Sequence, residues 1–216
     1  MSHFRSRLLL VLLLAAAVGV GAVMGSTRAA FSAQTKNQGS SFSAAASFCT
    51  SPGTQTVITN ADSWVAEDSP TNNNGTDGSL FVHAQAGARW RALVKFALPA
   101  KPANCSVTAA TLKLNAKAGV AGRTLQAFQA ASAWTEAAVT WNNQPATTGT
   151  AATAASLASG FVQWSVAAQV QAMYAGAANG FVVKDAAESD SSNIEQRFFS
   201  KEGTSTVQPQ LVVTFG

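Results

Sequence analysis

Residues 107–117 read Val-Thr-Ala-Ala-Thr-Leu-Lys-Leu-Asn-Ala-Lys, and this stretch indicates the fold class. Leu112 and Leu114 alternate with Lys113, which is the period of a β-strand with one face toward a core and the other toward water. In residues 91–98, Leu93 and Lys95 fall on one strand face and Val94 and Phe96 on the other. Strands of this kind are typical of antiparallel sheets with one solvated face.

The rest of the body repeats short apolar runs separated by turn residues, with no repeat of fixed period that would indicate a propeller or solenoid. One short helix is expected after Ser165, taken as its N-cap, because Val166, Val170 and Met173 share one helical face. Residues 146–158, nearly all Ala, Thr, Ser and Gly, fit either a surface loop or a weak edge strand. The sequence therefore predicts an all-β, antiparallel β-sandwich, most simply a jelly roll, with one short helix. The expected strands are 57–65, 80–85, 91–98, 107–117, 125–130, 161–165, 181–184, 197–200 and 211–215.

The N-terminus has the order of a secretory signal peptide. Arg5 and Arg7 precede an uncharged apolar run at 8–23, and small residues follow to Ala30, the expected cleavage site. A membrane anchor is the alternative, but this run of 16 residues is shorter than the roughly 20 that a spanning helix needs. We therefore expect a signal peptide at 1–30, an extended or flexible segment at 31–48, and a β-domain at 49–216.

Export changes how charge and cysteines are interpreted. The sequence pI is about 9.4, but residues 31–216 hold eleven basic and ten acidic residues, a net charge of +1. A nucleic-acid partner is therefore not expected, nor a membrane once the signal is removed. The two cysteines, Cys49 and Cys105, are expected to form a disulfide in a secreted or extracellular protein.

Residues 30–35 (AFSAQT) and 37–42 (NQGSSF) resemble the export signal of camelysin-type and TasA-type matrix proteins. The resemblance implies a bacterial surface or matrix setting. It supports an alternative function as a structural or surface-assembly protein without a sugar ligand, in which residues 31–46 add a strand to a neighbouring sheet.

Motifs across residues 57–215 resemble the DNRLRE-domain family of secreted β-sandwich modules. They are 61–65 (ADSWV), 91–96 (RALVKF), 109–114 (AATLKL), 134–145 (WTEAAVTWNNQP) and 199–202 (FSKE). The resemblance implies a non-catalytic module of the carbohydrate-binding kind, for polysaccharides that include acidic ones. The chain departs from the family at Asn74, where the family has Tyr, and at Ser165, where it has Asp. The motif residues for which structural roles are expected are Asp62, Trp134, Glu136, Trp141, Asn142 and Glu202.

Catalysis is not expected from the residues. His83 is the one histidine after the signal, it lacks a nucleophile motif nearby, and it is interpreted as an isolated surface histidine. No two carboxylates form a recognisable glycosidase pair. No cofactor or metal is expected either: residues 68–77 offer oxygen ligands for calcium but lack the usual spacing, so a plain turn with side-chain-to-backbone bonds is favoured.

The candidate carbohydrate-binding residues are Arg89, Trp90, Arg91 and Lys95. Arg91 and Lys95 share one strand face, so a basic strip there would suit the carboxylates of a uronate polymer. Trp90 beside it is left open between an exposed ring that stacks on sugars and a ring packed in the core. The alternative is internal pairing with Asp62, Glu136 or Glu202, which is favoured for Lys95 and left open for Arg91. The predicted function is a secreted, non-catalytic module that binds extracellular or cell-surface polysaccharide or matrix components.

Overall fold

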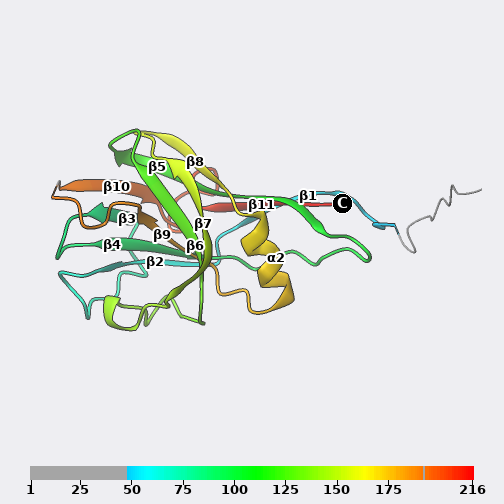
Figure 1. Cartoon of the computed structure of the whole chain (residues 1–216), viewed down its shortest axis with the longest axis horizontal. Helices are drawn as coiled ribbons and strands as arrows, with labels where there is room; N and C mark the ends of the chain where they lie inside the picture. The colour runs from blue at the N-terminus through cyan, green and yellow to red at the C-terminus, as the bar shows by residue number, and fades with distance from the viewer. Residues whose placement is uncertain (1–47, 192) are drawn as a thin grey trace, which may run out of the picture. The chain divides into compact units, whose positions relative to one another are not determined.

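The computed structural model describes residues 48–191 and 193–216, so the predicted signal peptide and segment 31–46 lie outside the described residues (Figure 1). The strands form one curled antiparallel sheet in the order β1-β11-β5-β10-β3-β4-β9-β6-β7, with β2 paired to β4 and β8 to β5. This arrangement confirms the predicted all-β sandwich. The elements are β1 (Gly53–Ile58), β2 (Ala61–Ala66), β3 (Ser79–Ala84), β4 (Trp90–Lys95), β5 (Val107–Gly119), β6 (Thr124–Ala130), η1 (Trp141–Asn143), β7 (Thr147–Ala155), β8 (Gly160–Ser165), α2 (Ala167–Ala175), β9 (Phe181–Asp185), β10 (Ile194–Phe199) and β11 (Gln210–Phe215).

The main core follows from the alternation along β5. Leu112 and Leu114 are fully buried, in one cluster with Val94, Val183 and Phe198 from β4, β9 and β10. Strands β4 and β9 pair directly, and so do β5 and β10, so this cluster joins the two halves of the curled sheet. Burial of this apolar surface is the main stabilising contribution to the fold.

A second, smaller core lies on the other face of β4 and β9. Leu93 pairs with Val182 across these strands, and both are fully buried. Trp134 and Val139, from the segment between β6 and β7, pack against them. This contact holds residues 131–146 against the sheet and positions Trp141 beside β4.

Two local expectations need correction. The run predicted as one strand at 57–65 is two strands, because Thr59 turns the chain: its N–H donates to Pro209 O at 3.0 Å and its hydroxyl to Lys95 O at 2.9 Å. Ser165 is the last residue of β8 and not a helix N-cap; Val166 holds that position, and its N–H donates to Ala110 O at 2.8 Å. Residues 147–155, left open between loop and strand, form the edge strand β7.

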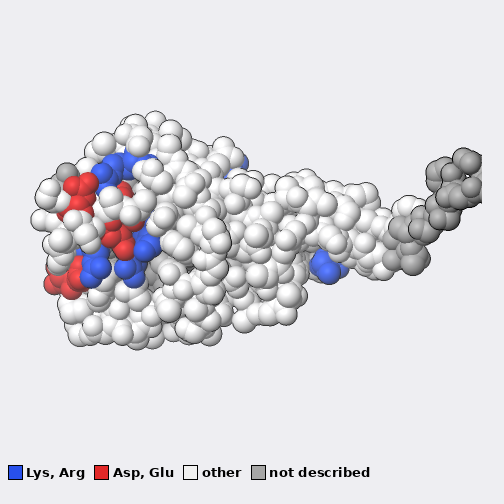
Figure 2. Space-filling model, in the orientation of Figure 1, with Lys and Arg blue, Asp and Glu red and all other residues white. Residues whose placement is uncertain are grey.

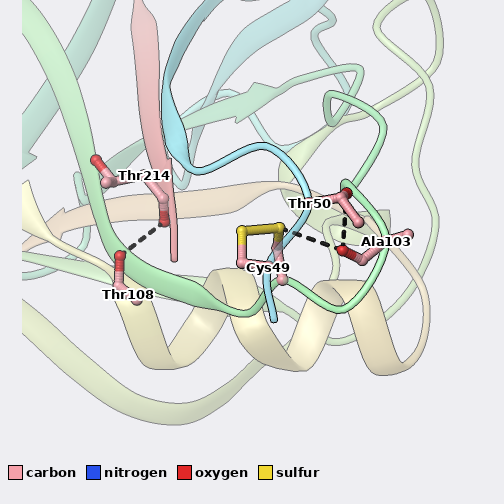
Figure 3. The surroundings of a disulfide bond; sticks show 6 residues. Cys49, Thr50, Ala103, Thr108 and Thr214 are labelled. Carbon is pink, nitrogen blue, oxygen red and sulfur yellow. Dashed lines mark hydrogen bonds between the residues drawn. A yellow bond between two sulfur atoms is a disulfide. The ribbon is translucent and has the colours of Figure 1, made fainter. Parts of the chain in front are cut away.

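The predicted disulfide is confirmed between Cys49 and Cys105, with an S–S distance of 2.01 Å (Figure 3). Beside it, the backbone N–H and the hydroxyl of Thr50 both donate to Ala103 O, at 3.1 and 3.0 Å. The bridge therefore fastens the chain before β1 to the loop that precedes β5.

Helix α2 is nine residues long and packs against β5. Within residues 48–191 and 193–216, no helix has the length and apolar character needed to cross a bilayer.

Candidate functional site

Two residues of the predicted basic strip, Arg89 and Arg91, are paired with carboxylates. Figure 2 shows Lys and Arg side chains directly against Asp and Glu side chains at one end of the domain. Arg89 donates from Nε to Glu67 at 2.7 Å and also from Nη2 to the second oxygen of that carboxylate. Arg91 donates from Nε and Nη2 to Glu188 at 2.6 and 2.9 Å. One bidentate edge of each guanidinium, Nε with Nη2, is therefore already bonded to a carboxylate.

Two further cations complete this arrangement, which we call the charged end. Lys184 lies 3.2 Å from Glu188, and Arg123 contacts both Asp185 and Asp190, at 2.9 and 2.8 Å. The hydrogen bond from Arg89 holds the pKa of Glu67 below its usual value, and the bonds to Asp185 and Asp190 raise the pKa of Arg123. Four cations thus face four carboxylates, and the charged end carries no net charge. Its members are Arg89, Arg91, Arg123, Lys184, Glu67, Asp185, Glu188 and Asp190.

Trp141 lies against the charged end. The guanidinium carbons of Arg89 and Arg91 lie 5.4 and 4.7 Å from its ring centroid. Gln144 accepts from Arg91 Nη1 at 3.2 Å and donates to Trp141 O at 3.1 Å. Four of the five tryptophans donate their indole N–H within the protein, to Asp77, Asp68, Asn179 O and Leu125 O. The half-buried Trp141 has no such acceptor among the described residues, so its N–H is available to a ligand.

Trp90 points to the opposite face of β4 from Arg91, because side chains alternate along a strand. Its ring contacts Trp64, Phe81 and His83, with centroids 5.3, 5.9 and 4.5 Å away. The interpretation of His83 as a surface residue is wrong. It is 3% exposed, with Nδ1 2.5 Å from Ala88 O and Nε2 2.6 Å from Asn193 Oδ1.

The pairing expected for Lys95 is also wrong. Its ammonium donates to Trp134 O and lies 4.6 Å from the centroid of that ring, and burial lowers its pKa. Lys201 forms the ion pairs that were expected of Lys95: its ammonium lies 3.2 Å from a carboxylate oxygen of Glu136 and 3.2 Å from one of Glu202.

Three predicted motif residues, Asp62, Glu136 and Glu202, meet around Lys201. Asp62 accepts from Lys201 N at 2.7 Å and donates its own N–H to Glu136 at 3.0 Å. Burial raises the pKa of Asp62 to about 7, and the negative charges of Glu202 and Glu136 add to the effect. This acidic cluster connects β2, residues 131–146 and the β10–β11 loop, so its bonds hold three segments of the fold together.

The same three carboxylates lie within 4.8 Å of one another, the one such group found in the described chain that could hold a metal ion. Oxygen ligands of this kind suit Ca²⁺ or Mg²⁺. The ammonium of Lys201 already bonds two of the three, and no further observation points to a metal. The sixth motif residue, Asn142, donates its N–H to Pro70 O at 3.1 Å.

The loop considered for calcium uses its polar side chains in hydrogen bonds within the protein. Asn73 donates to Glu136 O and Val139 O at 2.7 and 2.8 Å. Asp77 accepts from Trp64 Nε1 at 3.1 Å and from Ser79 N at 3.1 Å. The loop therefore packs against β2 and residues 131–146, and the expectation of no cofactor stays a prediction.

A second surface was not predicted from the sequence. On the outer face of β5, β8 and β10, which we call the β5 face, each of three cations lies over a phenylalanine ring. Lys113 lies 4.8 Å from the centroid of Phe161, and Lys117 lies 5.3 Å from that of Phe199. Arg197 lies 4.6 Å from the centroid of Phe81. The amide side chains of Gln163 and Gln210, directly opposite Lys113 on β8 and β11, adjoin this row.

The β5 face keeps a positive charge. Glu195 lies 3.8 Å from Arg197, whereas no ion pair to Lys113 or Lys117 is found in the described chain. Three cations and one carboxylate leave a net charge of +2. The alternation of Lys113 and Lys117 with buried residues was visible in the sequence. The register that brings β8 and β10 beside them was not.

An antiparallel sandwich that presents aromatic, amide and charged side chains on its outer faces has the form of a carbohydrate-binding module. The family model for carbohydrate-binding module family 96 matches residues 53–215, and the chain belongs to this family. A search of curated proteins finds no match. The family match confirms that the resemblance to a carbohydrate-binding domain was sound; the DNRLRE name and the export signal stay predictions.

Proposed function

We propose that the protein is an exported, non-catalytic module that binds an acidic extracellular polysaccharide through its β5 face. Membership of a carbohydrate-binding family supports the ligand class. The observation that carries the choice of ligand is the pair Lys113 and Lys117, two cations held on one strand face without a carboxylate partner in the described chain. The export half of the proposal depends on the signal peptide predicted at 1–30.

The aromatic rings make this face suitable for anions. A cation over an aromatic ring is attracted by the ring without being neutralised. Lys113 and Lys117 therefore have defined positions with no carboxylate paired to them in the described chain. Pyranose C–H groups also pack on aromatic rings, and Phe161 and Phe199 are both partly exposed beside these cations.

Each contact of this kind is weak alone. An ion pair at an exposed site contributes about 0.2–1 kcal/mol. A polymer that presents many carboxylates contacts Lys113, Lys117 and Arg197 together, and linked contacts raise the overall affinity without stronger individual bonds. The β5 face therefore fits a long acidic polysaccharide better than a single sugar acid.

Affinity electrophoresis of the full-length protein in gels containing alginate or polygalacturonate tests the proposal. The wild type should be retarded, and Lys113→Gln/Lys117→Gln should lose most of that retardation. Lys36→Gln/Lys101→Gln is the control, because it removes the same charge from residues that do not belong to β5, β8 or β10. Equal loss in both double variants would mean that net charge alone matters. Absence of retardation of the wild type by every acidic polymer would refute the proposed ligand.

A further inference from the structure

We propose that the charged end contains a second saccharide-binding site, centred on Trp141, which takes neutral, hydroxyl-rich sugars. This inference rests on the proposed carbohydrate-binding function, but it assigns a different surface and a different ligand class from the acidic polymer of the β5 face.

The first observation is the free indole N–H of Trp141. A buried or half-buried indole usually donates to an acceptor, and the other four indoles do so. Trp141 is half-buried beside two guanidinium groups, and its N–H has no acceptor among the described residues. A sugar hydroxyl is an acceptor of the right size for this position.

The second observation is the bonding capacity that remains around Trp141. Arg91 uses Nε and Nη2 for Glu188 and Nη1 for Gln144, which leaves N–H groups unused on both terminal nitrogens. Arg89 keeps unused N–H groups as well, since the hydrogen bonds that its side chain makes in the described chain all go to Glu67. Glu188 keeps acceptor positions. Sugar hydroxyl groups both donate and accept hydrogen bonds, so they can bond to the free arginine N–H groups and to the Glu188 carboxylate.

The third observation is that the ion pairs hold these groups in place. Arg91 is fixed by bonds to Glu188 and Gln144 and by the ring of Trp141, so its donors are ordered before any ligand arrives. Binding then loses less side-chain entropy, which favours affinity. The same order extends along the sheet, because Lys184 contacts both Glu188 and the ring of Phe128, at 3.2 and 5.3 Å.

The charge balance decides the ligand class. Four cations and four carboxylates leave no net field to attract an anionic polymer. A uronate carboxylate would have to use the N–H groups that the ion pairs leave free, close to the carboxylates of Glu188 and Glu67, whose negative charge repels it. A neutral sugar meets no such repulsion. The charged end therefore favours neutral saccharides, and the β5 face favours acidic ones.

The test is affinity electrophoresis of full-length protein against neutral polymers (laminarin, glucomannan and hydroxyethylcellulose) and against alginate. Trp141→Phe keeps a ring for the two arginines but removes the N–H. We expect about fivefold weaker binding to the neutral polymer, the usual effect of one lost hydrogen bond, and unchanged binding to alginate. Lys113→Gln/Lys117→Gln should show the opposite pattern.

Glu188→Gln is the second variant, read alongside thermal unfolding to show that it is folded. It leaves Arg91 and Lys184 without their carboxylate, so binding to neutral polymer should fall while binding to alginate rises. Wild-type protein that binds alginate but no neutral polymer would overturn the second site and leave the proposed function standing. Equal neutral-polymer binding by wild type and Trp141→Phe would overturn it too. Binding to neither class would refute both proposals.

Discussion

Arg91 on β4 donates two hydrogen bonds to Glu188, which lies after β9, at 2.6 and 2.9 Å. The Glu188 side chain is 11% exposed and that of Arg91 is 19% exposed. The pair therefore connects the β9–β10 loop to the outer face of the sheet at a site with little access to water, where loss of one partner leaves the other poorly solvated.

Glu188→Gln should lower the free energy of unfolding by about 1–3 kcal/mol, because two charge-assisted hydrogen bonds are weakened. Urea denaturation measures it, with Glu195→Gln as the matched control. Glu195 is 41% exposed and its ion pair with Arg197 spans 3.8 Å, so its replacement should change stability by less than about 0.5 kcal/mol. Equal effects of the two substitutions would show that the Arg91–Glu188 pair contributes no more than a surface pair.

Binding of acidic polysaccharide to the β5 face should weaken steeply with salt. Lys113 and Lys117 are at least partly exposed, and the Debye length falls from about 10 Å at 0.1 M to about 3 Å at 1 M ionic strength. Isothermal titration with alginate over a roughly tenfold range, from about 50 to about 500 mM sodium chloride, measures this dependence. Binding of neutral polymer to the charged end should change little over the same range, and a salt-independent affinity for alginate would contradict a role for the lysines.

Asp62 makes stability depend on pH. The pKa of Asp62 is about 7 in the folded protein, against 3.8 for an aspartate without these interactions, as in the unfolded chain. The folded state therefore holds a proton that the unfolded state releases. This stabilisation is full below about pH 4 and is lost as pH rises through 7. The change from this group is on the order of 4 kcal/mol across that window.

Asp62→Asn should remove this contribution, since its amide oxygen can still accept from Lys201 N while no charge forms. Urea denaturation at pH 5 and pH 8 should show a smaller loss of stability on raising the pH than in the wild type. Asp68→Asn is a control at an exposed carboxyl group. An identical pH dependence in wild type and Asp62→Asn would show that Asp62 is ionised in the folded protein throughout this range.

The strands were predictable because burial imposes a simple period. Leu112 and Leu114 alternate with Lys113, and the structure buries both leucines. Partners were harder to predict, since pairing depends on which strands become neighbours. The sequence left open whether Arg91 binds a ligand or pairs within the protein. In the structure it pairs with Glu188, 97 residues away. Lys95 was predicted to pair with acidic residues, including Glu136 and Glu202, that in the structure pair with Lys201. The β5 face depended on registers with β8 and β10 that no local pattern contains.

The bond between Cys49 and Cys105 should stabilise the domain mainly by restricting the unfolded chain. The two cysteines are 56 residues apart, and the loop they close corresponds to about 4 kcal/mol in the chain-entropy model. Cys49→Ser/Cys105→Ser should lower the free energy of unfolding by about that amount, measured by urea denaturation. Wild-type protein treated with reductant should match the double variant, and reductant should leave the double variant unchanged. Binding by the folded double variant should persist, because the bridge lies beside Thr50 and Ala103 and contributes no residue to the β5 face or the charged end. A double variant as stable as the oxidised wild type would contradict this assignment of the bridge's role.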